Sequence, residues 1–171
     1  MILKPFKGCQ KSSITQGFIY PQHTAVDFKG KYGTFLVAPE DCWVYRIVSP
    51  TTINDSTDDL ARGFGIRLKA NNSNIYYLYW HCLPFFPIEE KEQVKAEQIV
   101  AQMGNSGSVR TLEGGEIPLD QRNKPPYPGT HLHMEMLIDG IAVDPMALID
   151  WNSPVNYDAA SIISTIRKII G

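Results

Sequence analysis

Short segments rich in β-branched and aromatic residues, separated by clusters of turn-forming residues, recur along most of the chain. Three of them are WVYRIV at 43–48, GIRLK at 65–69 and IYYLYW at 75–80. The polar run NNSN at 71–74 separates the last two, so we expect residues 66–69 and 75–80 to form a hairpin. The pattern predicts a mainly β fold, built as a compact antiparallel sheet domain.

The end of the chain follows a different period. Apolar residues recur there at three- and four-residue steps, with Asp158 before them as a possible cap and Arg167-Lys168 in the last turn. This spacing predicts an amphipathic helix over about 157–170. We expect its apolar stripe to pack on its own domain rather than to dock on another chain. The stripe consists of Ala159, Ile162, Ile163, Ile166, Ile169 and Ile170.

Length and charge exclude several classes of protein. A chain of 171 residues can bury one core, so we expect a single domain over 1–171. Its 16 basic and 18 acidic residues disfavour a nucleic-acid partner. We find no apolar run of the roughly 20 residues that a membrane span needs, and no signal-peptide core near Met1. Cys9, Cys42 and Cys82 lack CxxC spacing, which predicts free, mostly buried thiols.

A strict alternation of polar and apolar residues marks residues 130–136 (THLHMEM). In a strand, His131, His133 and Glu135 would share one face, and Leu132, Met134 and Met136 would face the core. Neighbouring neutral imidazoles suit a divalent metal such as zinc. A pair of solvated strand histidines fits this segment equally well.

Two further histidines lie earlier in the chain. His23 and Asp27 are four residues apart, so they share a face in a strand or a helix, and the residues around them favour an extended segment. His81 ends the aromatic strand 76–80, where alternation would place it on the same face as Tyr77 and Tyr79. Taken alone, the His23–Asp27 spacing is a weak signal that arises more often by chance than from a metal site, and a lone histidine such as His81 is more often structural.

In this order, the segments resemble the lysostaphin- and LytM-type zinc endopeptidases, which cut bacterial peptidoglycan. Members of that family show an HxGxD segment, a GTPVxAPxDGxV block, a YxH strand, VxxGQxI followed by GNSG, an HLHxE strand and a G…VDP ending. The resemblance covers about 14–148. The matching segments are His23–Asp27, Gly33–Val44, Tyr79–His81, Val94–Ile99 with Gly104–Gly107, His131–Glu135 and Gly140–Pro145.

The resemblance implies a lysostaphin/LytM-like split barrel with a duplicated hybrid motif. It also implies that His23, Asp27 and His133 bind one zinc ion, with His81 and His131 beside it as catalytic histidines. Three protein ligands leave a fourth position for water, as in catalytic zinc sites. The implied reaction is hydrolysis of peptidoglycan stem peptides or cross-bridges by a metal-activated water. Residues expected to contact the substrate are Tyr20, Tyr79, Asn105 and Tyr127.

Several positions depart from the family pattern. Ala25, Cys42 and Glu97 stand where glycine is usual, so the backbone there must adopt a φ that a side chain tolerates. Trp80 replaces a small residue, and alternation would point it away from the face of Tyr79 and His81, into packing.

The segment Val109–Gly129 is longer than the family's usual link, and it is predicted to be a surface loop. It could form a lid or a substrate-binding wall, or be a passive insertion. As a wall, it could offer the acidic side chains of Glu113, Glu116 and Asp120 to a cationic group of the substrate.

Two questions of biology stay as expectations. Because we find no export signal, we expect one of two routes to the cell wall, where the enzyme would act. It would be carried on a phage particle, or it would remain in the host cytoplasm until holin-type release. The alternative to an enzyme is a non-catalytic structural or regulatory member of the family, such as a phage tail component. Such members typically lose zinc ligands, and this chain retains them.

Overall fold

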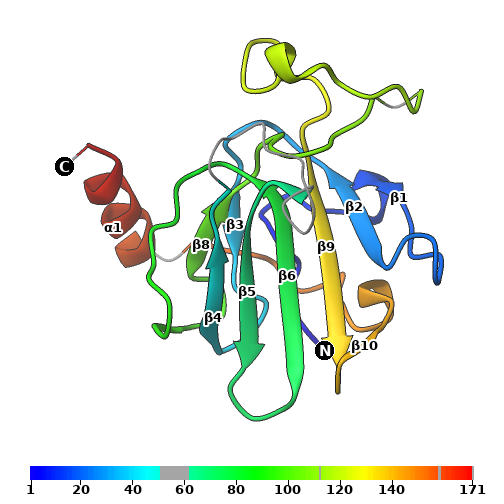
Figure 1. Cartoon of the computed structure of the whole chain (residues 1–171). Helices are drawn as coiled ribbons and strands as arrows, with labels where there is room; N and C mark the ends of the chain where they lie inside the picture. The colour runs from blue at the N-terminus through cyan, green and yellow to red at the C-terminus, as the bar shows by residue number, and fades with distance from the viewer. Residues whose placement is uncertain (51–61, 112, 158, 171) are drawn as a thin grey trace.

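The computed structural model describes residues 1–50, 62–111, 113–157 and 159–170. In these ranges eight strands form one antiparallel sheet in the order β1-β2-β9-β6-β5-β4-β7, with β10 also paired to β9, and two more strands, β3 and β8, form a separate pair (Figure 1). The mainly β antiparallel prediction is confirmed. The strands are β1 (Ile14–Gln16), β2 (Ala25–Lys29), β3 (Phe35–Val37), β4 (Cys42–Val48), β5 (Phe64–Ala70), β6 (Ile75–Cys82), β7 (Gln93–Val94), β8 (Ile99–Gln102), β9 (His131–Ile138) and β10 (Ile141–Ala142).

The aromatic strands form the predicted hairpin. β5 and β6 pair antiparallel, with Leu68 opposite Tyr77 and Ile66 opposite Tyr79. Alternation gives β6 two buried faces, since Tyr77 and Tyr79 point to one side and Leu78 and Trp80 to the other. The β5–β6 hairpin lies at the centre of the sheet. Its strand β6 pairs with β5 on one side and with β9 on the other.

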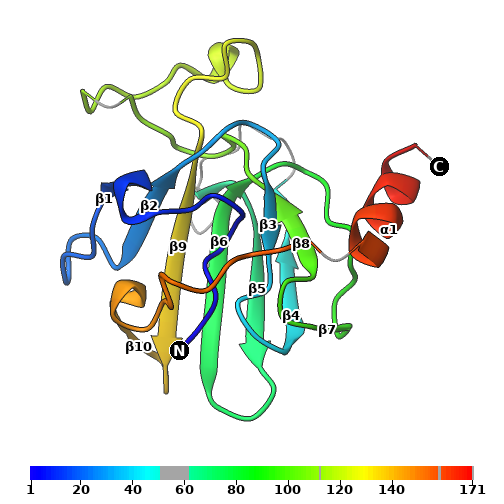
Figure 2. The ribbon, with the colours of Figure 1, turned by 180° about the vertical axis from the view of Figure 1, so that it is seen from behind.

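The main core lies on one face of the large sheet. Side chains such as Phe28, Leu68, Tyr79 and Leu132 are fully buried there. Strands β3 and β8, the N-terminal segment and the chain after β10 cover this face, as the view from behind shows (Figure 2). Trp80 belongs to a smaller cluster on the opposite face.

The chain ends in a helix, α1 (Ala159–Ile170), which lies beside β8 (Figures 1 and 2). Ile162 packs with Val37, Ile99 and Val155, whereas Ile163 and Ile166 remain 50% and 45% exposed. The described part of the stripe therefore packs only partly on the domain. The cap Asp158 and the side chains at 159–161, 164, 169 and 170 lie outside the described residues.

The short 3-10 helices are η1 (Lys11–Ser13), η3 (Leu119–Gln121) and η4 (Pro145–Ala147). No helix within the described ranges has both the length and the apolar character to cross a membrane.

The three glycine-like positions differ in their backbone. Ala25 and Cys42 lie in strands β2 and β4, without a positive φ, so they adopt a φ that a side chain tolerates, as predicted. Glu97 instead has a left-handed φ of +68°, which favours glycine. Its side chain accepts a hydrogen bond from the Asn156 amide. Cys42 is also buried and free, as are Cys9 and Cys82, as predicted.

Candidate metal centre

Two neighbouring strands form the floor of the site. β2 and β9 pair antiparallel, with Asp27 directly opposite His133 and Lys29 opposite His131. The predicted alternation of β9 is confirmed, because Leu132 and Met134 are fully buried in the core. His131 and His133 therefore project from the other face, toward Asp27.

His23, Asp27 and His133 bring three ligand atoms together. His23 Nε2 lies 3.4 Å from Asp27 Oδ1, and His133 Nδ1 lies 2.8 Å from the same oxygen. All three ligand atoms lie within 4.8 Å of one another. His23 comes from the bridge between Ile19 and His23, just before β2.

One buried nitrogen shows that this group fits a metal ion. His23 Nε2 is inaccessible to solvent and has no hydrogen-bond partner within the described part of the chain. A buried polar atom without a partner is costly, and a cation at this point would receive its lone pair. Two imidazoles and one carboxylate are the donor set of an open zinc site.

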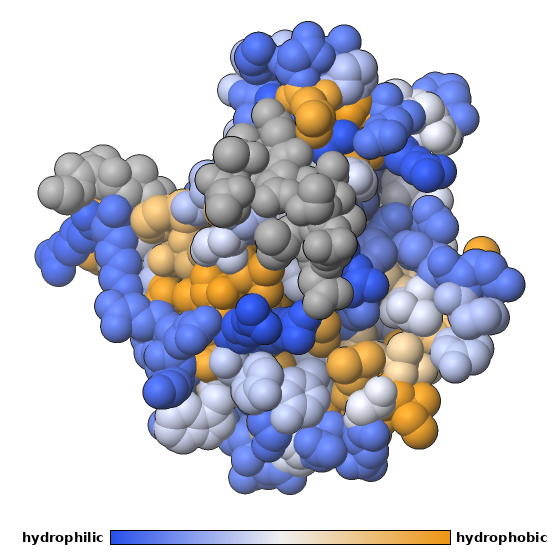
Figure 3. Space-filling view, viewed as in Figure 1, coloured by the Kyte–Doolittle hydropathy of each residue, from blue (hydrophilic) through white to orange (hydrophobic). Residues whose placement is uncertain are grey.

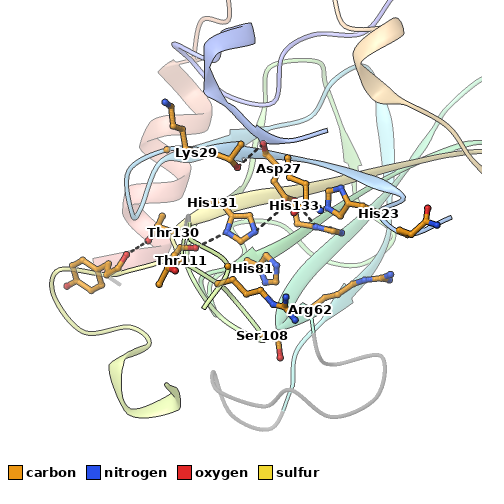
Figure 4. A pocket seen from close by; sticks show the side chains of 18 residues that line it. His23, Asp27, Lys29, Arg62, His81, Ser108, Thr111, Thr130, His131 and His133 are labelled. Carbon is orange, nitrogen blue, oxygen red and sulfur yellow. Dashed lines mark hydrogen bonds and ion pairs between the residues drawn. The ribbon is translucent and has the colours of Figure 1, made fainter. Parts of the chain in front are cut away.

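His81 and His131 stand beside this group. Their ring centroids are 4.6 Å apart, and the His81 ring lies 5.7 Å from that of His133. His81 is 5% exposed. Nitrogens of His81, His131 and His133 form a second cluster that also lies within 4.8 Å. Figure 4 shows the four histidines and Asp27 gathered at one end of the strands.

His81 does not lie where alternation places it. A regular strand would point it into the core with Tyr79, but its backbone has a left-handed φ of 59°. The β5–β6 register shifts at this point, between Phe64 and Ile66, so two residues of β6 oppose one of β5. The bulge turns His81 toward the histidine face, and the prediction of a shared face with Tyr79 is wrong.

Trp80 requires a related correction. It is buried, as predicted, but it lies opposite His133 in the β6–β9 register and donates a hydrogen bond from Nε1 to Glu135 at 2.9 Å. Cross-strand partners share a face of a sheet. Trp80 therefore packs on the histidine side of the sheet, beneath the site.

Backbone carbonyls hold three of the four rings. His23 Nδ1 lies 2.8 Å from the Gly17 oxygen, His81 Nδ1 2.7 Å from Ser106, and His131 Nδ1 2.7 Å from Gly129. A carbonyl only accepts, so each Nδ1 carries the proton and donates it. Nε2 of each ring is then left with a free lone pair.

Electrostatics act differently on the residues of the site. Burial alone would lower the pKa of His133, but the hydrogen bonds to Asp27 and Glu135 outweigh it and raise that pKa, so a metal ion has to displace a proton there. Burial, followed by the nearby rings of His131 and His133, holds the pKa of His81 well below its usual value. Burial likewise lowers the pKa of His131. Burial alone would raise the pKa of Asp27, but the hydrogen bond from His133 and the surrounding imidazoles outweigh it and lower that pKa. At neutral pH, His81 and His131 are neutral and Asp27 is ionised.

A pocket of about 850 Å³ opens above these residues. Besides the site, its lining includes three cationic residues, Lys29, Arg62 and Arg110. The acidic residues Glu113, Glu116 and Asp120 are not part of the lining, and Glu116 pairs instead with the buried Arg122. The expectation that these acids meet a cationic group of the substrate stays a prediction.

Residues of the long segment, among them Arg110, Gly114 and Tyr127, line the pocket, and its role as a lid, a substrate-binding wall or a passive insertion stays a prediction. We call residues 104–111 and 113–130 the wall segment; it stands above the sheet as a largely hydrophilic ridge (Figures 1 and 3). Tyr127 lines the pocket and stacks on Tyr32 with ring centroids 3.9 Å apart.

The other expected substrate contacts lie elsewhere. Tyr79 is fully buried, and its hydroxyl donates to the Val37 carbonyl. Asn105 is fully buried too, and its amide binds backbone within the wall segment. Substrate contact is therefore wrong for both. Tyr20 is 68% exposed but lies outside the pocket lining.

Two residues that the structure brings to the site had no role in the sequence prediction. Glu135 pairs with His133 Nε2 at 3.6 Å and with Arg62 at 3.1 Å. The alternation of residues 130–136 placed Glu135 on the histidine face, and this pattern could have predicted that Glu135 lies at the site. Arg62 precedes β5, and no local pattern indicated it.

Solved structures share this fold at low sequence identity. LytU is 24% identical over 85% of this chain and 89% of its own, with a TM-score of 0.59. The catalytic domain of lysostaphin, an antimicrobial peptidase from Staphylococcus simulans, is 20% identical over 86% of this chain and 88% of its own, with a TM-score of 0.54. A zinc-containing peptidase from Vibrio cholerae is 20% identical over 85% of this chain and 40% of its own, with a TM-score of 0.58.

Sequence comparison identifies the family. No curated protein sequence matches the chain. The family model described as Peptidase family M23 matches residues 21–145, which contain Asp27 and all four histidines. The chain belongs to peptidase family M23, the lysostaphin- and LytM-type zinc metallopeptidases.

Proposed function

We propose that this chain is a zinc-dependent endopeptidase that hydrolyses peptide cross-links of bacterial peptidoglycan. The observation that carries the proposal is the convergence of His23 Nε2, Asp27 Oδ1 and His133 Nδ1 beside two further histidines. These three residues would hold one zinc ion. When bound, zinc polarises the scissile carbonyl and lowers the pKa of a water toward neutrality.

His81 and His131 supply the remaining chemistry. Both keep Nε2 free because Nδ1 donates to a backbone carbonyl, and both line the pocket. A neutral imidazole at that position can accept the proton of the attacking water and return it to the leaving amine. Once protonated, the same group stabilises negative charge on the carbonyl oxygen.

The lining of the pocket supports a peptide that carries carboxylates. Lys29, Arg62 and Arg110 all line it, and Asp27, its one acidic residue among those described, belongs to the proposed metal site. Cationic side chains complement carboxylate groups, which peptidoglycan stem peptides possess. The charge of the lining therefore supports a stem peptide as the bound partner more than a neutral glycine bridge.

Purified sacculi of several cross-link chemistries test the proposal. The zinc-loaded protein is incubated with each, and the released fragments are identified by mass spectrometry. We expect new amino termini at one type of peptide bond, and none with the His133→Ala variant or with a strong chelator. Intact sacculi from every chemotype, with about one zinc bound per chain, would count against a wall-cutting enzyme and favour a non-catalytic role.

A further inference from the structure

The four histidines of the site differ in what holds their rings. A backbone carbonyl accepts from Nδ1 in His23, His81 and His131. His133 is the exception, because both of its nitrogens face carboxylates. Its Nδ1 lies 2.8 Å from Asp27 Oδ1, and its Nε2 lies 3.6 Å from Glu135 Oε1.

This exception matters because His133 would bind the metal through Nδ1. A nitrogen that binds a metal must be free of its proton, so the proton of a neutral His133 has to lie on Nε2. The side chain is only 15% exposed, which leaves Nε2–H in need of an acceptor within the protein. Glu135 Oε1 faces that nitrogen.

Glu135 is itself held in place from two sides. It is 5% exposed, accepts a hydrogen bond from Trp80 Nε1 at 2.9 Å and pairs with Arg62 at 3.1 Å. The Trp80 ring packs against the backbone of Gly65, where a Cβ would lie 2.3 Å from Trp80 Cε3. Arg62 and Arg67 lie over the same ring, at 5.6 and 5.5 Å.

We propose that Glu135 is a positioning residue that accepts a hydrogen bond from Nε2–H of His133 when Nδ1 gives up its hydrogen bond to Asp27 and binds the metal, while Trp80 and Arg62 aim the Glu135 carboxylate. The role rests on the proposed zinc function. Glu135 does not line the pocket, so it acts through His133 rather than on the substrate. Glu135 would accept a hydrogen bond from the His133 ring, as backbone carbonyls accept from the other three rings. Because Glu135 acts through its side chain, a substitution can remove it.

A competing explanation gives Glu135 a structural role only, as the buried partner of Arg62. Both explanations predict a change in thermal stability when Glu135 is replaced. They differ in zinc affinity and in the hydrogen bond of His133 Nε2–H, both of which a purely structural carboxylate would leave unchanged.

Two variants of the full chain separate the explanations. Glu135→Met removes the acceptor and keeps an unbranched side chain, whereas Glu135→Gln removes the charge but keeps an oxygen that accepts. Zinc affinity is measured at constant pH by competition with a chelator, and the hydrogen bond of His133 Nε2–H is read from its 1H and 15N chemical shifts in the zinc-loaded protein. The matched control is Glu40→Gln, since Glu40 also accepts a hydrogen bond on the sheet, from Tyr77, away from the site.

We expect zinc to bind about 10 to 100 times more weakly to Glu135→Met, the usual cost of losing such a partner. In the zinc-loaded variant, Nε2–H of His133 should lose the chemical-shift signature of a hydrogen bond to a carboxylate. Glu135→Gln should recover most of the affinity, and the control should match the wild type. If Glu135→Met does not fold, Trp80→Phe, which removes one donor to Glu135, should weaken zinc binding about three- to tenfold, a fraction of that cost.

Unchanged zinc affinity with an unchanged chemical shift of His133 Nε2–H, in Glu135→Met or in the substitute Trp80→Phe, would overturn this inference. Equal losses in the Met and Gln variants would overturn it too, since the acceptor would then be irrelevant. Failure of the proposed function looks different: the wild-type protein would bind zinc with the expected dependence on Glu135 and yet leave all sacculi intact.

Discussion

The floor and the wall of the pocket are built in different ways. In the floor, β2 and β9 are joined by a continuous ladder of backbone pairs from Ala25–Glu135 to Lys29–His131. The wall segment has one isolated bridge within its described part, between Arg110 and Glu116. Three buried polar side chains, Asn105, Ser106 and Arg122, hold the wall instead.

Their hydrogen bonds explain how an irregular segment keeps its shape. Arg122, with its side chain 1% exposed, donates to the carbonyls of Gly107 and Ile117 and pairs with Glu116. Asn105 donates to the Pro128 carbonyl at 2.9 Å and accepts from the Asn123 amide at 3.1 Å. The floor therefore depends on backbone pairing, which substitution leaves intact, and the wall on single side chains.

The largest effect is expected in the floor. Asp27→Ala or His133→Ala should reduce zinc from about one per chain to almost none, because two ligands hold the ion poorly. Hydrolysis should disappear with it. The far-ultraviolet circular dichroism should stay the same, since the β2–β9 ladder uses backbone groups. Metal analysis checks this, with Lys29→Ala, from the same strand, as the control that keeps its zinc. A fully loaded Asp27→Ala protein would refute the ligand assignment.

The second effect separates the chemistry of hydrolysis from metal binding, at a histidine of β6 beside the floor. His81→Asn should retain zinc while hydrolysis falls by roughly two to four orders of magnitude, the scale expected on losing a positioned acid–base group. Asparagine suits this position because it tolerates the left-handed backbone that His81 adopts. Turnover is measured on a fixed peptide substrate, together with metal content. Near-normal turnover, or loss of the metal, would contradict the assigned role.

The third effect is confined to the wall. Arg122→Met should leave zinc content unchanged but lower stability, because the carbonyls of Gly107 and Ile117 lose their donor. We expect the free energy of unfolding to fall by about 2 to 4 kcal/mol, which corresponds to a decrease of roughly 5 to 15 °C in Tm. KM should rise more than kcat falls, since the wall positions substrate rather than reacting with it.

Calorimetry, metal analysis and steady-state kinetics test the wall variant. Arg167→Met, which replaces an exposed arginine of α1, is the matched control and should behave as the wild type. If Arg122→Met instead lost its zinc at an unchanged Tm, the separation between floor and wall would be wrong.

The smallest effect concerns the aromatic stack between wall and body. Tyr127→Ala should lower the free energy of unfolding by about 0.5 to 1.5 kcal/mol, because it removes the ring that stacks on Tyr32. Hydrolysis of sacculi should change by less than about tenfold, the equivalent of that energy. Tyr127→Phe keeps the stack and should match the wild type in both measurements. If Tyr127→Ala and Tyr127→Phe have the same Tm and the same rate of hydrolysis, the stack contributes to neither stability nor activity.

The floor was largely predictable from sequence, for a physical reason. Strand alternation has a period of two residues, so the pattern of residues 130–136 already separated Leu132 and Met134 from His131 and His133. The ordered motifs supplied the expectation that His23 and Asp27 would join them, and the register of β2 with β9 brings Asp27 opposite His133.

Errors arose where one residue breaks the local period. Alternation along β6 placed His81 with Tyr79, but the bulge and the left-handed φ of His81 reverse its side. Asn105 and Tyr79 carry polar groups suited to a substrate, yet burial engages both with backbone carbonyls. Residue type alone did not reveal which polar groups face the pocket.

By itself, the sequence determined the strand-rich fold, the faces of β9 and the ordered set of ligand-type residues, because each depends on short periods or on contiguous motifs. The tertiary structure decided the rest. The side of the sheet that His81 occupies, the support of Glu135 by Trp80 and Arg62, and the hold of Arg122 on the wall all depend on bulges and on folded partners. Their cause is the packing of the whole chain, in which a buried polar group must find its partner wherever the fold supplies one.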